Sequence, residues 1–259
     1  MGLDVDPDRL PRGVERTLDG LAAFNRGIIA ATADLACAFK VNLAFYEALG
    51  VDGWRLLRLT REALPRDLIA IADGKRGDVG HSSAFYARAL FDELGFDAVT
   101  ANPYLGFDAL EPFLSRPERG VFVLCKTSNP GSAELQDLPC QVGGETVPLY
   151  QVVARRAVTW NRRGNCGLVV GATYPRELAA VRALAKDLPL LVPGVGAQGG
   201  DLEASVRAGV DDRGELLVVN ASRQVLYASA DEDWQKAARR TARDLRDALN
   251  VARGVGSGR

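Results

Sequence analysis

The sequence predicts an α/β protein that folds as one (β/α)8 barrel domain over residues 1–259. Short apolar, β-prone runs alternate with longer segments of helical periodicity, and there are eight such runs. The runs are continuously apolar, as expected for parallel strands that are buried on both faces. The rival is an open, doubly wound sheet, which usually carries a Gly-x-Gly-x-x-Gly turn after its first strand. The opening GLDVDPDRLP contains no such turn, so the barrel is favoured.

The predicted elements follow one another at the spacing of a barrel. Amphipathic stretches at 14–36, 81–95 and 175–188 predict helices between the strands, and a C-terminal helix is predicted at about 232–253. The first strand is very short. In chain order, the predicted strands cover residues 2–5, 38–42, 68–73, 98–102, 120–127, 167–172, 190–195 and 216–221.

One connection does not fit the barrel pattern. The stretch 129–147, NPGSAELQDLPCQVGGETV, is longer than an ordinary loop between a strand and a helix. It is rich in Gly and Pro and follows the fifth predicted strand. In a barrel such a loop lies on the face that carries the active site. The sequence therefore predicts an insertion over that face.

The overall composition excludes several classes of partner. The chain is 47% hydrophobic and 25% charged, with a formal net charge of −1, so nothing global attracts nucleic acid or an anionic membrane. No apolar run approaches the ~20 residues of a membrane span, and the acidic N-terminus shows no signal-peptide pattern. We expect a cytoplasmic protein that binds anions through local groups.

Cysteine and histidine usage argues against a metal centre. Cys37, Cys125, Cys140 and Cys166 form no Cys-x-x-Cys pair, which favours reduced core cysteines over a disulfide or a metal site. His81 is the lone histidine, and it leaves little scope for zinc chemistry or a Ser-His-Asp triad. We therefore predict no bound metal.

The most informative stretch is IAIADGKRGDVGHSS, residues 69–83, where an apolar run ends on opposite charges. Asp73 and Lys75 are two residues apart, so they project to one side if the strand extends that far. A lysine between carboxylates such as Asp73 and Asp78 keeps its proton. Such a lysine is a poor Schiff-base nucleophile and a good general acid. The alternative is a structural cluster of salt bridges.

Lysine is rare enough in this chain to be informative. Only five of the 32 basic residues are lysine, and Lys40, Lys75 and Lys126 each follow an apolar run. These sites therefore favour a compact ammonium group over a guanidinium. Lys40 could snorkel out of the barrel, but its place late in a predicted strand favours the active site.

Two glycine-rich or polar stretches predict an anion site near the last strands. Loops after the seventh and eighth strands of such barrels often bind phosphate through backbone N–H groups. PGVGAQGG (193–200) and VNASR (219–223) lie there. Glycine lets the backbone approach an anion, Arg223 offers a bidentate fork and Gln198 a neutral donor. Together they predict a phosphate site.

Ser128 is ambiguous from its local sequence. It lies in KTSNPG (126–131), at the end of the fifth predicted strand. Ser-Asn-Pro-Gly is ordinary turn chemistry, so Ser128 either caps a turn or contacts a ligand.

Taken in order, these motifs resemble the orotidine 5′-phosphate decarboxylase family, in its longer bacterial branch. The resemblance runs from about residue 3 to residue 227 and rests on DGKRGD, FKVNLAFYE, TSNPG, PGVGAQGG and VNASR. It implies cofactor-independent decarboxylation of orotidine 5′-phosphate to uridine 5′-phosphate, the last step of de novo pyrimidine nucleotide synthesis. Each motif is unspecific alone, and the ordered set is highly specific.

The resemblance also implies roles for individual residues. Lys75 would protonate C6 of the pyrimidine as carbon dioxide leaves, and Asp73 would lie beside the departing carboxylate. Asp4 and Lys40 would contact the ribose hydroxyls and join the charged network. Ser128 would read the pyrimidine ring. The phosphate would be held by Gln198, Ser222 and Arg223.

The resemblance further implies a homodimer with shared active sites. Asp78 would reach into the partner's site, with Ser82 in the position that threonine usually holds. Two alternatives remain: a sugar-phosphate decarboxylase or aldolase of the same barrel type, and a catalytically silent barrel that binds nucleotide. The first would need magnesium and lacks a pyrimidine-reading Ser-x-Pro-Gly. The second predicts a missing member of the Asp-Lys-Asp set, and all three are present.

Overall fold

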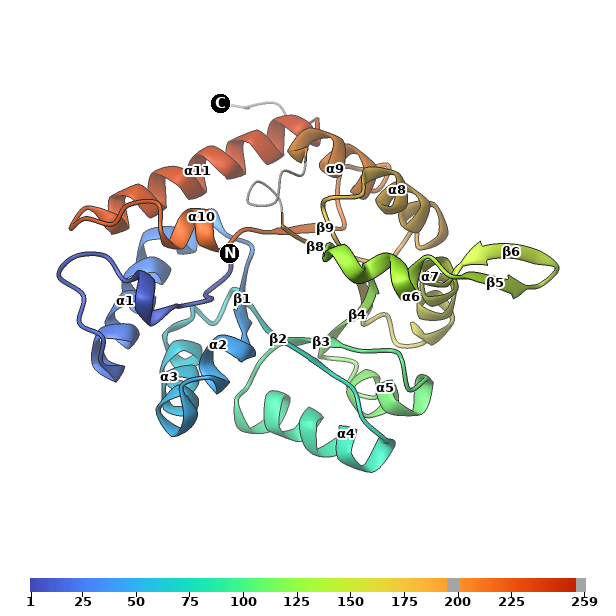
Figure 1. The fold of residues 1–259 in the computed structure, drawn as a ribbon, viewed down its shortest axis with the longest axis horizontal. Coiled ribbons are helices and arrows are strands. Elements are labelled where there is room, and N and C mark those ends of the chain that lie inside the picture. The colour runs from blue at the N-terminus through green and yellow to red at the C-terminus, as the bar shows by residue number, and fades with distance from the viewer. Residues whose placement is uncertain (195–200, 255–259) are drawn as a thin grey trace.

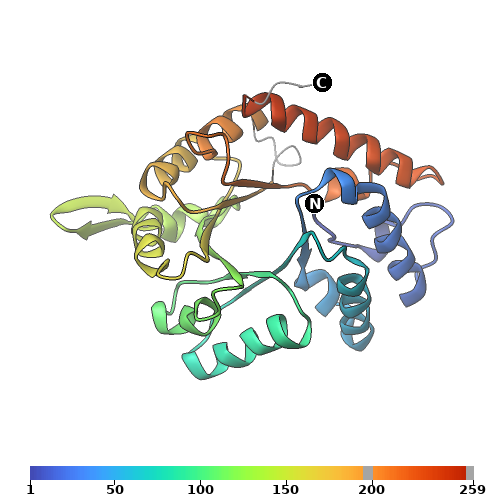
Figure 2. The same ribbon diagram turned by 180° about the vertical axis from the view of Figure 1, so that it is seen from behind.

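The computed structural model describes residues 1–194 and 201–254. Within these residues the main sheet has seven parallel strands in the order β1-β2-β3-β4-β7-β8-β9. Helices surround the strands on all sides (Figure 1, and from behind in Figure 2). This is the predicted (β/α)8 barrel. The strands of the main sheet are β1 (Ala38–Asn42), β2 (Ile69–Arg76), β3 (Ala98–Ala101), β4 (Gly120–Lys126), β7 (Cys166–Val170), β8 (Leu190–Pro193) and β9 (Leu217–Asn220).

The helices occupy the segments between the strands. The predicted helix at 81–95 is α4 followed by a π-helical turn, Arg88–Glu93, and short 3-10 turns lie at Pro7–Arg9, Ala33–Leu35 and Pro130–Ser132. The α-helices are α1 (Leu18–Thr32), α2 (Leu43–Glu47), α3 (Gly50–Ala63), α4 (Gly80–Ala87), α5 (Phe107–Leu114), α6 (Ala133–Gln136), α7 (Leu149–Trp160), α8 (Pro175–Leu184), α9 (Leu202–Gly209), α10 (Arg223–Leu226) and α11 (Trp234–Ala252).

The N-terminal segment closes the ring between β1 and β9. The Gly2 N–H donates to the Ala221 carbonyl at 2.8 Å, and the Leu3 N–H donates to the Lys40 carbonyl at 2.9 Å. The predicted strand at 2–5 is thus a parallel bridge from Gly2 to Lys40 rather than a regular strand. A Cβ on Gly2 would lie 1.9 Å from Ser222 Oγ, so this close approach requires glycine.

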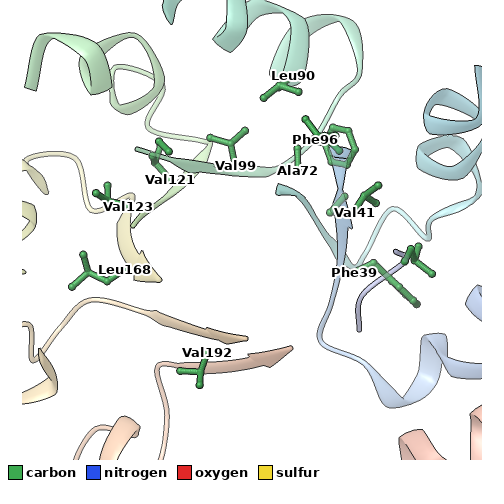
Figure 3. Close-up of a cluster of buried hydrophobic side chains, with 14 of the residues drawn as sticks. Phe39, Val41, Ala72, Leu90, Phe96, Val99, Val121, Val123, Leu168 and Val192 are labelled. Atoms are coloured by element: carbon green, nitrogen blue, oxygen red, sulfur yellow. The ribbon is translucent and has the colours of Figure 1, made fainter. Parts of the chain in front are cut away.

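The apolar runs fill two cores, because successive strand residues point to opposite faces. The outer core lies between the sheet and the helices and includes Phe39, Val99 and Val192, which Figure 3 labels with seven others. The inner core fills the barrel with Ala38, Ile71, Ala98, Phe122, Val169 and Leu191. Burial on both faces explains why the strand sequences are continuously apolar.

The insertion forms a second, separate sheet. Strands β5 (Pro139–Val142) and β6 (Glu145–Pro148) pair as an antiparallel hairpin, which extends away from the barrel (Figures 1 and 2). Gly143 and Gly144 form the two-residue turn, with φ of 61° and 85°. These left-handed conformations suit glycine and produce a tight hairpin.

The cysteines are free thiols. Cys125 and Cys166 are buried, and burial raises the pKa of each thiol to about 12. Cys37 is exposed and Cys140 is half-buried, so the prediction of core cysteines is wrong for these two.

Candidate active site

A layer of polar side chains lies directly above the inner core of the barrel. Residues two positions beyond the inner core share its orientation, because the side-chain period of a strand is two. On β1, β2 and β3 these residues are Lys40, Asp73 and Thr100, and on β9 the corresponding residue is Asn220. The regular alternation of the strands therefore directs these four groups to the carboxyl end of the barrel.

This polar layer forms the floor of a cavity of about 460 Å³. That volume lies within the usual range for small-molecule sites, about 300–1,000 Å³. The cavity opens at the carboxyl ends of the strands, where barrel enzymes carry their active sites. The predicted site residues that line it are Asp4, Lys40, Asp73, Lys75, Ser128, Ser222 and Arg223.

Asp73 is the centre of the charged network. Its Oδ2 lies 2.6 Å from Lys40 Nζ, and its Oδ1 lies 2.6 Å from Lys75 Nζ. Burial alone would raise the pKa of Asp73, but the two ammonium groups outweigh it and lower the pKa from 3.8 to about 2. Asp73 therefore stays ionised at neutral pH.

Lys75 has an unusual backbone. Its φ is +49°, in the left-handed region that non-glycine residues rarely adopt. The pairing of β2 with β3 shifts register between Ala72 and Arg76, so a bulge lies at this point. β2 extends to Arg76, and Asp73 and Lys75 line the same cavity with their charged groups in contact, as the sequence predicts. The bulge and the left-handed φ of Lys75 are what strand alternation did not predict.

Thr100 stabilises this bulge and was not predicted as a site residue. Its Oγ1 accepts a hydrogen bond from the Lys75 N–H and donates one to Asp73 Oδ1, each at 2.9 Å. Its exposed fraction is 1%. The signal was the alternation in AVTA, which places Thr100 two residues after the inward-facing Ala98.

Lys40 and Asp4 lie on the neighbouring side of the cavity. Lys40 Nζ is 4.0 Å from Asp4 Oδ1, and both side chains are buried. Asp4 Oδ1 has no hydrogen-bond partner among the described residues. A buried acceptor without a partner is costly, so a ligand hydroxyl in the cavity would satisfy it.

Ser222 lies beside the N-terminal segment, and Arg223 follows it as the first residue of α10. Asn220 Nδ2 donates to Ser222 Oγ at 3.2 Å, and Asn220 Oδ1 is buried without a partner among the described residues. Pro193 and Gly194 also line this side of the cavity. Gln198, the other predicted phosphate ligand, lies outside the described residues.

Ser128 lines the cavity from the segment that follows β4. The neighbouring Gly171 follows β7, and a Cβ there would lie 2.8 Å from the Ser128 Cβ. Glycine at position 171 therefore allows the Ser128 segment to pack against the end of β7.

Asp78 and Ser82 lie elsewhere. They line a second cavity, of about 700 Å³, with His81, Phe85, Tyr86, Arg88, Ala89 and Glu93. Asp78 Oδ1 accepts a hydrogen bond from the Val79 N–H at 2.7 Å. Within one chain, the structure does not bring Asp78 or Ser82 to the cavity that holds Lys75.

Two features are absent from the residues that the structure describes. These residues contain no cluster of three His, Cys, Asp or Glu side chains that could hold a metal ion. Among them, no helix is long and apolar enough to cross a membrane.

Comparison with known proteins gives a consistent result. A model of the orotidine 5′-phosphate decarboxylase / HUMPS family matches residues 3–240. The chain is 54% identical over 254 residues to a Thermomicrobium roseum protein named orotidine 5′-phosphate decarboxylase, covering 98% of this chain and 90% of that protein. A protein of the same name from Dehalococcoides mccartyi is 50% identical over 250 residues, covering 96% and 91%.

Two solved structures are similar to this chain in fold and sequence. The Leishmania donovani OMP decarboxylase has a TM-score of 0.83 and 40% identity, with 98% of this chain and 92% of that chain covered. The Leishmania donovani UMP synthase has a TM-score of 0.87 and 41% identity, with 97% of this chain and 53% of that chain covered.

Proposed function

The chain belongs to the orotidine 5′-phosphate decarboxylase family, as its motifs predict, and on that premise we propose which of its side chains carry the reaction. It decarboxylates orotidine 5′-phosphate to uridine 5′-phosphate in pyrimidine synthesis. The sugar-phosphate and silent-barrel alternatives are not favoured, since relatives at 50–54% identity over nearly the whole chain carry the decarboxylase name.

Lys75 is the proton donor in this proposal. Loss of carbon dioxide from C6 leaves a carbanion with no ring carbonyl placed to delocalise it, so a fixed cation and a ready proton are needed there. The side chain of Lys75 is 45% exposed to the cavity, whereas that of Lys40 is 5% exposed. Lys75 can therefore reach the substrate, and Lys40 serves chiefly to hold Asp73. The network of Lys40, Asp73 and Lys75 is the observation that carries the proposal.

Asp73 lies beside the departing carboxylate. Its low pKa keeps it negative at neutral pH, so a substrate carboxylate beside it is repelled until it leaves as neutral carbon dioxide. Asp73 also fixes the ammonium group of Lys75 through the 2.6 Å contact. Preorganised charge of this kind needs no rearrangement during the reaction.

The other predicted site residues bind the ribose, the phosphate and the base of the substrate. Asp4 Oδ1, which has no partner within residues 1–194 and 201–254, accepts from a ribose hydroxyl. Arg223 and the Ser222 N–H bind the phosphate together with Gln198, and Ser128 reads the pyrimidine ring. Binding energy from the distant phosphate is then available to hold the reacting ring in position.

A homodimer completes the site. Asp78 and Ser82 lie outside the Lys75 cavity of their own chain, which suits a role in the site of a partner. Val79 and Phe85 beside them are 57% and 53% exposed, as expected for a face that is covered by a second copy. The proposal includes a single domain over residues 1–259 and a cytoplasmic location.

The activity is tested by following the absorbance of orotidine 5′-phosphate, with and without a chelator. Loss of absorbance in both conditions is expected. Activity that disappears with the chelator would support a metal-dependent enzyme and contradict the assignment.

The shared site is tested by mixing two inactive dimers, Lys75→Ala and Asp78→Ala, under conditions in which subunits exchange. A hybrid dimer carries one intact site and one doubly damaged site, so activity should return. If mass analysis confirms hybrids and activity stays absent, Asp78 acts within its own chain.

A further inference from the structure

One side chain of the insertion is bonded to the segment that carries Ser128. Gln136 Oε1 accepts from the Thr127 N–H at 2.8 Å, and Gln136 Nε2 donates to Thr127 Oγ1 at 2.7 Å. Thr127 Oγ1 in turn donates to Asn129 Oδ1 at 2.6 Å. The residues on both sides of Ser128 are therefore held, directly or through Thr127, by Gln136.

The base of the insertion is itself anchored to the barrel. Lys126, the last residue of β4, is 1% exposed, and its Nζ lies 2.6 Å from Asp137 Oδ1. The ammonium group also lies 5.1 Å from the ring centre of Tyr174 and 5.8 Å from that of Tyr150. A buried ammonium without its carboxylate is strongly unfavourable, so the pair holds Asp137 in place. Gln136 is the adjacent residue and is fixed with it.

The other side of the Ser128 segment is closed by β7. The Gly171 N–H donates to the Lys126 carbonyl at 2.8 Å. A Cβ at position 171 would lie 2.9 Å from the Ser128 backbone nitrogen, so the segment already packs at close range there. Movement towards β7 is blocked, and the two Gln136 hydrogen bonds hold the neighbouring Thr127 in place.

We propose that Gln136 is a positioning residue for pyrimidine recognition, and that the insertion sets base discrimination through it. Gln136 is not among the described residues that line the cavity, whereas Thr127, Ser128 and Asn129 are. Gln136 therefore acts through Ser128 rather than on the substrate. The inference rests on the proposed role of Ser128 in reading the pyrimidine ring.

The test measures binding of three probes to the full-length enzyme: uridine 5′-monophosphate, cytidine 5′-monophosphate and ribose 5-phosphate. The two nucleotides differ at the base edge, and the sugar phosphate lacks the base. Gln136→Ala should weaken uridine 5′-monophosphate binding about tenfold and reduce the enzyme's preference for it over the cytidine nucleotide. The variant lacks both hydrogen bonds to Thr127, and a hydrogen bond contributes up to about this factor to a binding constant. Ribose 5-phosphate binding should change less than about twofold, within the error expected for an unaffected contact.

Two matched variants control for general damage. Gln136→Glu keeps an acceptor for the Thr127 N–H and should bind uridine 5′-monophosphate more tightly than Gln136→Ala does. Gln141→Ala removes an exposed amide that donates to Thr146 within the hairpin, and it should leave all three affinities unchanged. If Gln136→Ala weakens the binding of ribose 5-phosphate as much as that of the nucleotide, the loss does not concern the base and the proposal fails.

A Ser128→Ala variant separates this inference from the proposed function. If Ser128→Ala leaves the preference for the uridine nucleotide intact, Ser128 does not read the base, and both the role of Ser128 and the inference fail. If Ser128→Ala lowers that preference and Gln136→Ala does not, the inference alone fails. If Gln136 acts through Ser128, the double variant should lose no more discrimination than Ser128→Ala. Additive losses would contradict the proposal.

Discussion

The Thr100→Val substitution tests whether the bulge at Lys75 is held from β3. Valine matches threonine in shape, so the change removes both hydrogen bonds of the hydroxyl with little change in packing. It leaves the part-buried Lys75 N–H without its partner and removes one donor from Asp73 Oδ1. An unsatisfied buried donor costs about 1–3 kcal/mol, and a hydrogen bond to a charged group contributes about 1.5–3 kcal/mol.

The expected result is a loss of turnover with little change in substrate binding. Lys75 holds a left-handed φ that costs about 1–2 kcal/mol for a non-glycine residue, so the bulge relaxes when its support is removed. We expect kcat to fall by about 10- to 100-fold, which corresponds to about 1.4–2.7 kcal/mol. KM should change little, since the ribose phosphate contacts are intact.

The assay is steady-state decarboxylation with thermal unfolding measured in parallel. Thr100→Ser keeps the hydroxyl and should retain most of the activity, although it lacks the methyl group. Unchanged kcat in a folded Thr100→Val enzyme would refute the argument that Thr100 positions Lys75.

Two further predictions concern charge and anion binding. Because the pKa of Asp73 is lowered from 3.8 to about 2, its contribution to stability is present above pH 3.8 and is lost as the pH falls towards 2; the contribution is about 2 kcal/mol. Chemical denaturation between pH 5 and pH 2 should therefore show a smaller acid loss for Asp73→Asn than for the unmodified enzyme, and equal losses would contradict the pKa. Arg223→Ala should weaken the binding of orotidine 5′-phosphate far more than that of the bare nucleoside orotidine. Equal losses of affinity for both would exclude Arg223 from the phosphate site.

The strand order was predictable because burial on both faces leaves a simple signature. The run of β7 has no charged or polar side chain, and that of β4 has none before its last residue, Lys126, so length and spacing were sufficient to count them. The closing strand at 2–5 was only partly predictable. The Gly2 N–H donates to Ala221, just after β9, and the Leu3 N–H donates to Lys40 of β1. Too few residues pair to make a regular strand.

The charged residues of the cavity were predictable from strand alternation, but the local backbone that carries Lys75 was not. Lys40 and Asp73 follow the period of two from the inner core. Lys75 also reaches the cavity, from a bulge on β2 where its N–H bonds to Thr100 of the next strand. A single sequence does not reveal such a contact between strands.

The hairpin of the insertion has a signal in the sequence. Gly143 and Gly144, between two β-prone stretches, indicate a two-residue hairpin turn. The contact of Gln136 with Thr127, by contrast, depends on how the insertion folds back on β4. No local pattern predicts it.

The most direct test of the central claim, that Lys75 delivers the proton, is the turnover of Lys75→Ala, with Lys236→Ala on the exposed face of α11 as the matched control. The variant should stay folded while decarboxylation falls at least about a thousandfold, or about 4 kcal/mol, since the donor and the main cation are lost together. The control should keep full activity. A fall of less than about tenfold, or about 1.4 kcal/mol, in Lys75→Ala would contradict the role of Lys75 as the acid.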